Sequence, residues 1–166
     1  TEVIVTETTE YPFDEKIALK LATPKPVPFP LYLRVPAWCD QPAVRVNGKA
    51  VDVAGKAGGF IVLERTWANG DAVELTLPMQ VKLRTWTKNH HTVSVDRGPL
   101  TYSLRIAEKY VRHGGTDRWP AWDIFPDSPW NYGLELPASD PEKAFKIVRK
   151  AWPADDQPFR WDAAPI

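Results

Sequence analysis

This 166-residue sequence has little cysteine and histidine and carries no net charge. The single cysteine, Cys39, cannot form an intrachain disulfide, so it says little about a redox compartment. The 21 basic and 21 acidic residues cancel, which removes the electrostatic footprint of a nucleic-acid-binding protein and of a polybasic membrane contact. No apolar run approaches the roughly 20 residues that span a bilayer. We therefore expect neither nucleic acid nor a membrane among the partners.

Residue types that carry catalysis are also scarce. His90 and His91 are adjacent, so on a strand they would point to opposite faces and would not converge on one metal ion. No Gly-x-Ser-x-Gly elbow occurs, and Cys39 beside Trp38 at a strand end is better explained as a structural cysteine than as a nucleophile. The sequence therefore predicts no catalytic residue, no metal site and no cofactor in this chain.

What the chain has is alternation of apolar and polar residues. Residues 16–22 place Ile17, Leu19 and Leu21 on one side, and residues 31–35 repeat the pattern. Such a period of two is typical of a sheet with one wet face. The strands predicted from it cover residues 2–9, 16–22, 31–35, 44–51, 60–65, 72–77, 81–86, 92–95 and 100–106.

Turn residues between these strands predict antiparallel pairing. Asn47 and Gly48 both tolerate a positive φ, which a two-residue hairpin turn of type I′ requires. Residues 60–65 and 72–77 read as a second hairpin across the turn at 67–71. We expect an all-β fold, an antiparallel β-sandwich of jelly-roll or immunoglobulin-like type, with its core in residues 1–106.

The composition changes after residue 106. Residues 107–141 carry five prolines and few alternating runs, which predicts a long, ordered loop that wraps the domain. Asp140 and Pro141 could open a short helical turn, and residues 144–151 are predicted to form a late strand. Residues 142–166 are therefore interpreted as a return strand and the start of a further segment of a longer polypeptide.

Aromatic residues concentrate in the Pro/Trp-rich segment: Trp119, Trp122, Trp130 and Tyr132. One interpretation is a platform on which sugar rings stack, as in a carbohydrate-binding module. Another is a buried core or a seam against a neighbouring domain, and a third is the rim of a neighbouring active site. Burying a tryptophan removes about 150–250 Å² from water, at roughly 25 cal/mol per Å², so the core or seam is favoured.

Two further groups of residues could carry function. Arg97, in the stretch Asp96–Leu100, is either pinned within a tight strand connection or presented to a neighbouring domain or ligand, and the structural role is favoured. Asp123, Asp127 and Glu135 lie near the aromatic residues and could form a catalytic carboxylate pair. Acidic residues in turns more often accept hydrogen bonds from backbone N–H groups.

Several segments, in this order, resemble the β-sandwich region of family 127 glycoside hydrolases, the β-L-arabinofuranosidase-like enzymes. The Asp96–Tyr102 stretch is similar to a strand of that family that contains Arg-Gly-Pro-Leu. The other matching segments are residues 33–38, 44–48, 59–65, 67, 69–71, 73–79, 130–134, 158–159 and 164–166.

The resemblance implies a glycosidase whose catalysis belongs to a separate helical barrel. In the family that barrel carries a cysteine nucleophile and a zinc ion held by cysteines and a glutamate, and Cys39 matches none of those positions. This chain is then expected to be a non-catalytic accessory sandwich of an enzyme acting on plant-type glycans. Its expected partners are its own barrel domain and an oligosaccharide, and a periplasmic or secreted location is expected for the parent enzyme.

Overall fold

The computed structural model describes residues 1–53, 56–160 and 163–166. Its strands pair only in antiparallel fashion. Among the described residues, no helix is long and apolar enough to cross a membrane. The elements are β1 (Ile4–Thr9), β2 (Lys16–Ala22), β3 (Val27–Arg34), β4 (Ala43–Val46), β5 (Lys49–Val51), β6 (Phe60–Trp67), β7 (Ala72–Thr76), β8 (Val81–Trp86), β9 (Thr92–Arg97), β10 (Leu100–Tyr102), β11 (Glu108–Gly115), β12 (Pro120–Pro126) and the 3-10 helix η1 (Pro141–Ala144).

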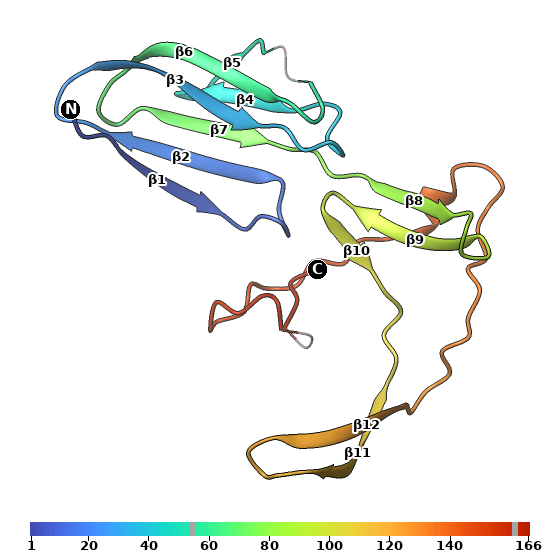
Figure 1. The fold of residues 1–166 in the computed structure, drawn as a ribbon. Helices are drawn as coiled ribbons and strands as arrows, with labels where there is room; N and C mark the ends of the chain where they lie inside the picture. The colour runs from blue at the N-terminus through green and yellow to red at the C-terminus, as the bar shows by residue number, and fades with distance from the viewer. Residues whose placement is uncertain (54–55, 161–162) are drawn as a thin grey trace.

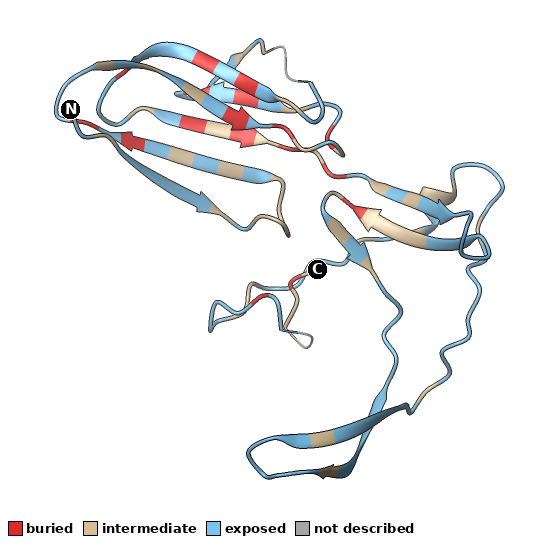
Figure 2. Ribbon diagram, viewed as in Figure 1, coloured by how far each residue is buried: buried red, intermediate tan, exposed pale blue. Residues whose placement is uncertain are grey.

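The first seven strands form a β-sandwich (Figure 1). A five-stranded sheet in the order β1-β2-β7-β4-β5 packs against the two-stranded sheet β3-β6. The inward-facing apolar residues of both sheets meet in one cluster, and the buried residues concentrate there (Figure 2). The cluster consists of Leu21, Leu33, Val35, Cys39, Val44, Val46, Ile61, Leu63, Trp67, Val73, Leu75 and Leu77. The predicted all-β antiparallel fold is confirmed.

The turn between β4 and β5 forms as its residues predict. Asn47 and Gly48 have φ values of 50° and 76°, and the flanking residues Val46 and Lys49 pair across the hairpin. The Asn47 side chain also donates to Asp71 Oδ1 at 2.8 Å. The turn is therefore closed by the pairing of its own strands and is also hydrogen-bonded to the loop before β7.

The second predicted hairpin, between residues 60–65 and 72–77, is wrong. β6 pairs with β3, whereas β7 lies between β2 and β4 in the other sheet. The turn at Ala68–Asp71 does reverse the chain, but it also carries the chain from one layer of the sandwich to the other. Local turn chemistry specifies the reversal and leaves the choice of sheet to the packing of the core.

Strands β8, β9 and β10 form a separate three-stranded sheet that follows the sandwich in the chain (Figure 1). The turn between β8 and β9 contains His90 and His91, both with positive φ. These two histidines thus lie in a tight connection. The predicted domain boundaries at residues 106 and 141 stay predictions.

Part of the predicted wrapping loop is a hairpin. Within residues 107–141, β11 and β12 pair from Glu108 with Pro126 to Gly115 with Pro120. The prolines therefore lie at the two ends of β12, where a missing backbone donor disturbs the ladder least. Figure 1 shows this hairpin reaching away from the sandwich, so it does not wrap the domain.

The predicted strand at 144–151 is also wrong. Residues 145–150 have no regular structure, and η1 begins after Asp140 with Pro141 in its first turn, although the Asp140 side chain makes no capping hydrogen bond. The C-terminal segment instead returns to the turn between β1 and β2. There the Phe13 ring lies 6.0 Å from Trp152 and 5.1 Å from Phe159. Residues 161–162 of the predicted return segment lie outside the described residues.

Candidate functional site

We call residues 108–134, which comprise the β11–β12 hairpin and the segment after it, the aromatic arm. Contacts within its own turn stabilise the hairpin. Arg112 and Gly114 flank an irregularity in the strand register, and Arg112 Nη1 contacts Asp117 Oδ1 at 2.8 Å. Gly115 has a φ of 76° where an added Cβ would lie 2.3 Å from the Trp119 carbonyl oxygen, so only glycine fits there.

Both faces of this hairpin carry exposed apolar side chains. Directly paired residues share a face, so Tyr110 and Ile124 lie on one face together with Trp122, whose ring meets the Tyr110 ring edge-on at 6.3 Å. Val111 and Phe125 lie on the other face. All five side chains are exposed, from 40% for Val111 to 57% for Ile124. A two-stranded hairpin without a covered face is marginally stable in water, so the arm is suited to packing against another surface.

The four aromatic residues singled out from the sequence all lie on the arm. Trp119 is 72% exposed, Trp130 is 61% exposed and Tyr132 is 67% exposed. Trp122 is 47% exposed. The prediction that these residues are buried in this chain's own core is therefore wrong, because the sandwich core is filled by residues that precede the arm. What the arm presents is an apolar surface without a covering partner among the described residues.

Arg97 lies elsewhere and is only 5% exposed. Its guanidinium contacts Glu15 Oε1 at 3.0 Å and Met79 Sδ at 3.5 Å, while Glu15 Oε1 also accepts a hydrogen bond from the Met79 backbone N–H at 3.0 Å. A guanidinium buried in this way cannot meet a ligand in solvent. Arg97 instead ties the β8–β10 sheet to the β1–β2 end of the sandwich.

The structure brings no catalytic set together from the residues considered. Asp123, Asp127 and Glu135 are exposed, and the Asp123 carboxylate lies 3.7 Å from His113 Nε2. Cys39 is fully buried, and this burial raises the pKa of its thiol, which disfavours the nucleophilic thiolate. Among the described residues, no three His, Cys, Asp or Glu side chains gather where they could hold a metal ion.

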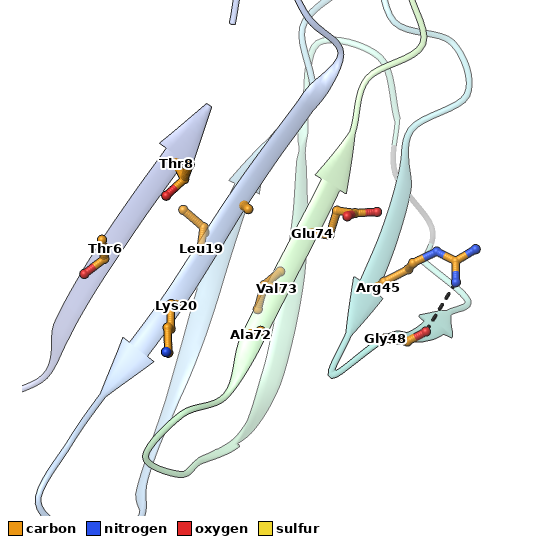
Figure 3. Close-up of a pocket in the computed structure, with 10 residues that line it drawn as sticks. Thr6, Thr8, Leu19, Lys20, Arg45, Gly48, Ala72, Val73 and Glu74 are labelled. Atoms are coloured by element: carbon orange, nitrogen blue, oxygen red, sulfur yellow. Dashed lines mark hydrogen bonds between the residues drawn. The ribbon is translucent and has the colours of Figure 1, made fainter. Parts of the chain in front are cut away.

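A depression of about 260 Å³ lies on the outer face of the five-stranded sheet (Figure 3). The register of β2, β4 and β7 places Lys20, Arg45 and Glu74 around the small residues Ala18 and Ala72. The depression has a charged rim but no aromatic side chain. It resembles an ordinary solvated sheet face, and we assign it no chemistry.

Comparison with known proteins identifies part of the chain. Residues 1–79 match the family model described as "Beta-L-arabinofuranosidase, GH127 middle domain". The match ends at Met79, shortly after β7, the last strand of the sandwich. A search of curated proteins finds no match to the chain.

Three solved structures are similar to the chain. A protein named "Glycoside hydrolase" is 24% identical with a TM-score of 0.55, and the match covers 81% of this chain and 27% of that one. A GH127 beta-L-arabinofuranosidase from Geobacillus stearothermophilus T6 is 26% identical with a TM-score of 0.55, over 82% of this chain and 26% of that one. A GH127 beta-arabinofuranosidase is 19% identical with a TM-score of 0.53, over 74% and 28% respectively.

The fold and these similarities define a class: a β-rich, arabinofuranosidase-like domain of a glycoside hydrolase. Within it, residues 1–79 match the model of a GH127 middle domain, which confirms the resemblance seen in the sequence. The chain spans about a quarter of the length of each of the three structures.

Sequence reasoning missed four exposed apolar residues of the hairpin: Tyr110, Val111, Ile124 and Phe125. A signal for them was present, because Trp122 and Ile124 alternate with Asp123 as on a strand. The prolines at both ends of this run hid it, since prolines argue against a strand when they stand inside one.

Proposed function

We propose that this chain is a non-catalytic accessory region of a β-L-arabinofuranosidase-type glycoside hydrolase that acts on plant-type glycans. In this proposal it supports a separate catalytic helical-barrel domain, and the aromatic arm packs against that domain. The observation that carries the proposal is the arm itself, whose apolar side chains are exposed on both faces. The match of residues 1–79 to a middle domain supports the presence of neighbouring domains in the same enzyme.

The chemistry of the chain supports a non-catalytic role. The resemblance implies a zinc ion and a cysteine nucleophile in the parent enzyme. The described residues do not fit either group, because the one cysteine is fully buried and no cluster of metal-binding side chains surrounds it. We therefore assign both groups to the catalytic domain and derive no reaction step for this chain.

Hydrolysis assays test the proposal. The full-length enzyme and the 166-residue chain are compared on 4-nitrophenyl β-L-arabinofuranoside and on arabinose-containing oligosaccharides. We expect the full-length enzyme to release product and the chain alone to release none. Turnover by the chain alone would overturn the non-catalytic assignment.

Charge-removing variants check the remaining carboxylates in the full-length enzyme. Asp123→Asn, Asp127→Asn and Glu135→Gln are expected to leave the kcat of the full-length enzyme within about twofold, because none of these groups is placed in catalytic machinery. A loss of several orders of magnitude in any one of them would place the active site on the arm.

A further inference from the structure

A second surface lies where the sandwich meets the β8–β10 sheet. A pocket of about 290 Å³ opens there between the loop that follows β3 and the strands β8, β9 and β10. Its walls combine one large aromatic ring with several polar groups. We call it the Trp38 pocket; it is lined by Trp38, Gln80, Lys82, Arg84, Asp96, Gly98, Pro99 and Thr101.

The turn that contains Arg97 builds one wall of this pocket. Successive residues of a strand point to opposite faces, so Asp96, which precedes the buried Arg97 at the end of β9, faces outward. The inward contact of Arg97 with Glu15 fixes the turn from beneath. Gly98 has a φ of 56° and lies against Met79, where an added Cβ would approach the Met79 side chain to 2.7 Å. The turn thus holds Asp96 and Pro99 in place at the pocket.

Asp96 is the centre of the polar wall. Its Oδ1 accepts hydrogen bonds from Thr101 Oγ1 at 2.7 Å and from Arg84 Nη2 at 3.2 Å. Its Oδ2 lies 3.0 Å from Arg84 Nε, so the guanidinium binds the carboxylate through two nitrogens. This bidentate pair orients three polar side chains before any ligand arrives.

The charges of the pocket compensate each other. Arg84 is paired with Asp96, and Lys82 is paired with Asp40 at 3.1 Å. Gln80 is exposed, and its amide makes no hydrogen bond within the described part of the chain. A pocket in which each cation already has a carboxylate partner offers little attraction to an anion, but it still offers donors and acceptors to hydroxyl groups.

Trp38 supplies the apolar wall. It is half-buried and packs against the sandwich core, so its position is fixed and part of its surface faces the pocket. A sugar ring has an apolar face of C–H groups and a rim of hydroxyls, which is the combination that an aromatic wall beside oriented polar groups accommodates. The volume of about 290 Å³ lies just below the range of about 300–1,000 Å³ that holds drug-sized ligands, so the pocket is suited to a ligand of one or two sugar rings.

We propose that the Trp38 pocket is a binding site for one or two rings of a neutral saccharide, with Trp38 as the stacking wall and Gln80, Arg84 and Asp96 as hydrogen-bonding partners. The site goes beyond the proposed accessory function, because a domain can support a catalytic partner without binding any sugar. It is also distinct from the aromatic arm, which contributes no residue to it.

Calorimetric titration of the 166-residue chain with arabinobiose, xylobiose and galactobiose tests the site. We expect at least one of them to bind with a Kd on the order of 1 mM, a value typical of a small, open site. Trp38→Ala is expected to raise that Kd by about tenfold because the stacking wall is lost, and Trp38→Phe is expected to stay within about threefold of the parent chain. Gln80→Ala, at an exposed position, is expected to weaken binding by about threefold.

Trp119→Ala is the matched control, since Trp119 is an exposed tryptophan of the aromatic arm and does not line the pocket. Equal weakening by Trp119→Ala and Trp38→Ala would overturn the proposal, as would no binding of any of the three sugars at about 50 mM. Tighter binding of digalacturonate than of galactobiose would overturn its neutral specificity. If Trp38→Ala unfolds the chain, the Kd values of Trp38→Phe and Gln80→Ala test the proposal in its place. None of these outcomes bears on hydrolysis, so the accessory function is tested separately.

Discussion

At the scale of single residues, Trp67 joins the two strands of the β3-β6 sheet and lies in the core of the sandwich. The side chain is fully buried in the core cluster. Its Nε1–H donates to the Phe29 carbonyl at 2.9 Å, and its ring lies 5.9 Å from the Phe29 ring. The Arg65 guanidinium lies 5.0 Å from the ring centroid on the same strand. Trp67 thus combines apolar burial with a satisfied polar group.

Replacing Trp67 is expected to cost more stability than any change on the arm. Trp67→Ala leaves a large cavity and should lower the free energy of unfolding by about 3–5 kcal/mol. Trp67→Phe keeps an aromatic ring but loses the hydrogen bond to Phe29, so we expect a loss of about 1–3 kcal/mol. Urea unfolding of the 166-residue chain measures both, and a loss under about 1 kcal/mol for Trp67→Ala would contradict the described core.

Asp71 gives the sandwich a dependence on pH. A hydrogen bond from the Ala68 backbone N–H at 2.8 Å and another from the Asn47 side chain, also at 2.8 Å, lower the pKa of this carboxyl in the folded chain. Because the folded-state pKa lies below the unfolded value of about 4, the stabilisation is present above about pH 4 and is lost as the pH falls through the folded-state pKa.

Asp71→Ala should therefore destabilise the chain at pH 7, and the difference from the parent chain should narrow below about pH 4. Urea unfolding at a series of pH values measures this difference. Asp52→Ala is a suitable control, because Asp52 is exposed and takes part in no hydrogen bond within the described part of the chain. If the difference in unfolding free energy between Asp71→Ala and the parent chain stays constant from pH 7 to pH 3, the charge of the Asp71 carboxylate contributes nothing to stability.

At the scale of elements, the arm differs from the sandwich strands in how its apolar residues are used. β2, β4, β6 and β7 each bury one face in the core. β11 and β12 bury neither face and pair only with each other. The apolar residues of the arm therefore contribute little to the stability of the isolated chain, and their contribution depends on a partner surface.

A double variant of the arm should have different effects on the stability of the isolated 166-residue chain and of the full-length enzyme. Trp122→Ser with Ile124→Ser is expected to change the unfolding free energy of the 166-residue chain by less than about 0.5 kcal/mol, as for other exposed positions. In the full-length enzyme the same variant should cost about 2–4 kcal/mol, because both side chains would be buried there. Thermal and urea unfolding measure both contexts.

Tyr32→Ser serves as the control for the arm variant. Tyr32 is 59% exposed and lies on β3 of the sandwich. An equal loss for the arm variant in the isolated chain and in the full-length enzyme would contradict packing of the arm against another domain. The same packing would be contradicted if Tyr32→Ser lowered the unfolding free energy of the full-length enzyme as much as the arm variant does.

The strands of the sandwich were predictable because each carries its own signal. The alternation of Ile17, Leu19 and Leu21 identifies a strand with one buried face, and Asn47-Gly48 identifies a hairpin, whatever the rest of the chain does. The partner of β6 was not predictable in this way. Its pairing with β3 instead of β7 is decided by which arrangement closes the core around Trp67, and such long-range packing leaves no local mark.

The candidate sites were predictable only in part. The exposed tryptophans of the arm were found as a cluster, but a sequence cannot tell an exposed aromatic cluster from a buried one. The inward direction of Arg97 follows from its contact with Glu15, which lies 82 residues earlier in the chain. The Trp38 pocket was missed because it forms where the loop after β3 meets the β8–β10 sheet, and these segments become neighbours only in the folded chain.

At the scale of the whole molecule, the chain has four parts that are joined in different ways. The sandwich of β1–β7 has one continuous core. The β8–β10 sheet is attached to it through the contact of Arg97 with Glu15, and the C-terminal segment returns to the same end through the rings around Phe13. The arm extends beyond these contacts (Figure 1). Such an arrangement suits a domain that is completed by a larger protein.

Amide hydrogen exchange of the arm tests this account most directly. Backbone amides of residues 108–126 are compared in the 166-residue chain and in the full-length enzyme, with the amides of β2 and β7 as the internal reference. The account predicts rapid exchange of the arm in the isolated chain, because an uncovered hairpin opens at little cost. It predicts protection close to that of β2 and β7 in the full-length enzyme. Equal exchange of the arm in the two proteins would contradict the claim that the arm packs against the rest of the enzyme.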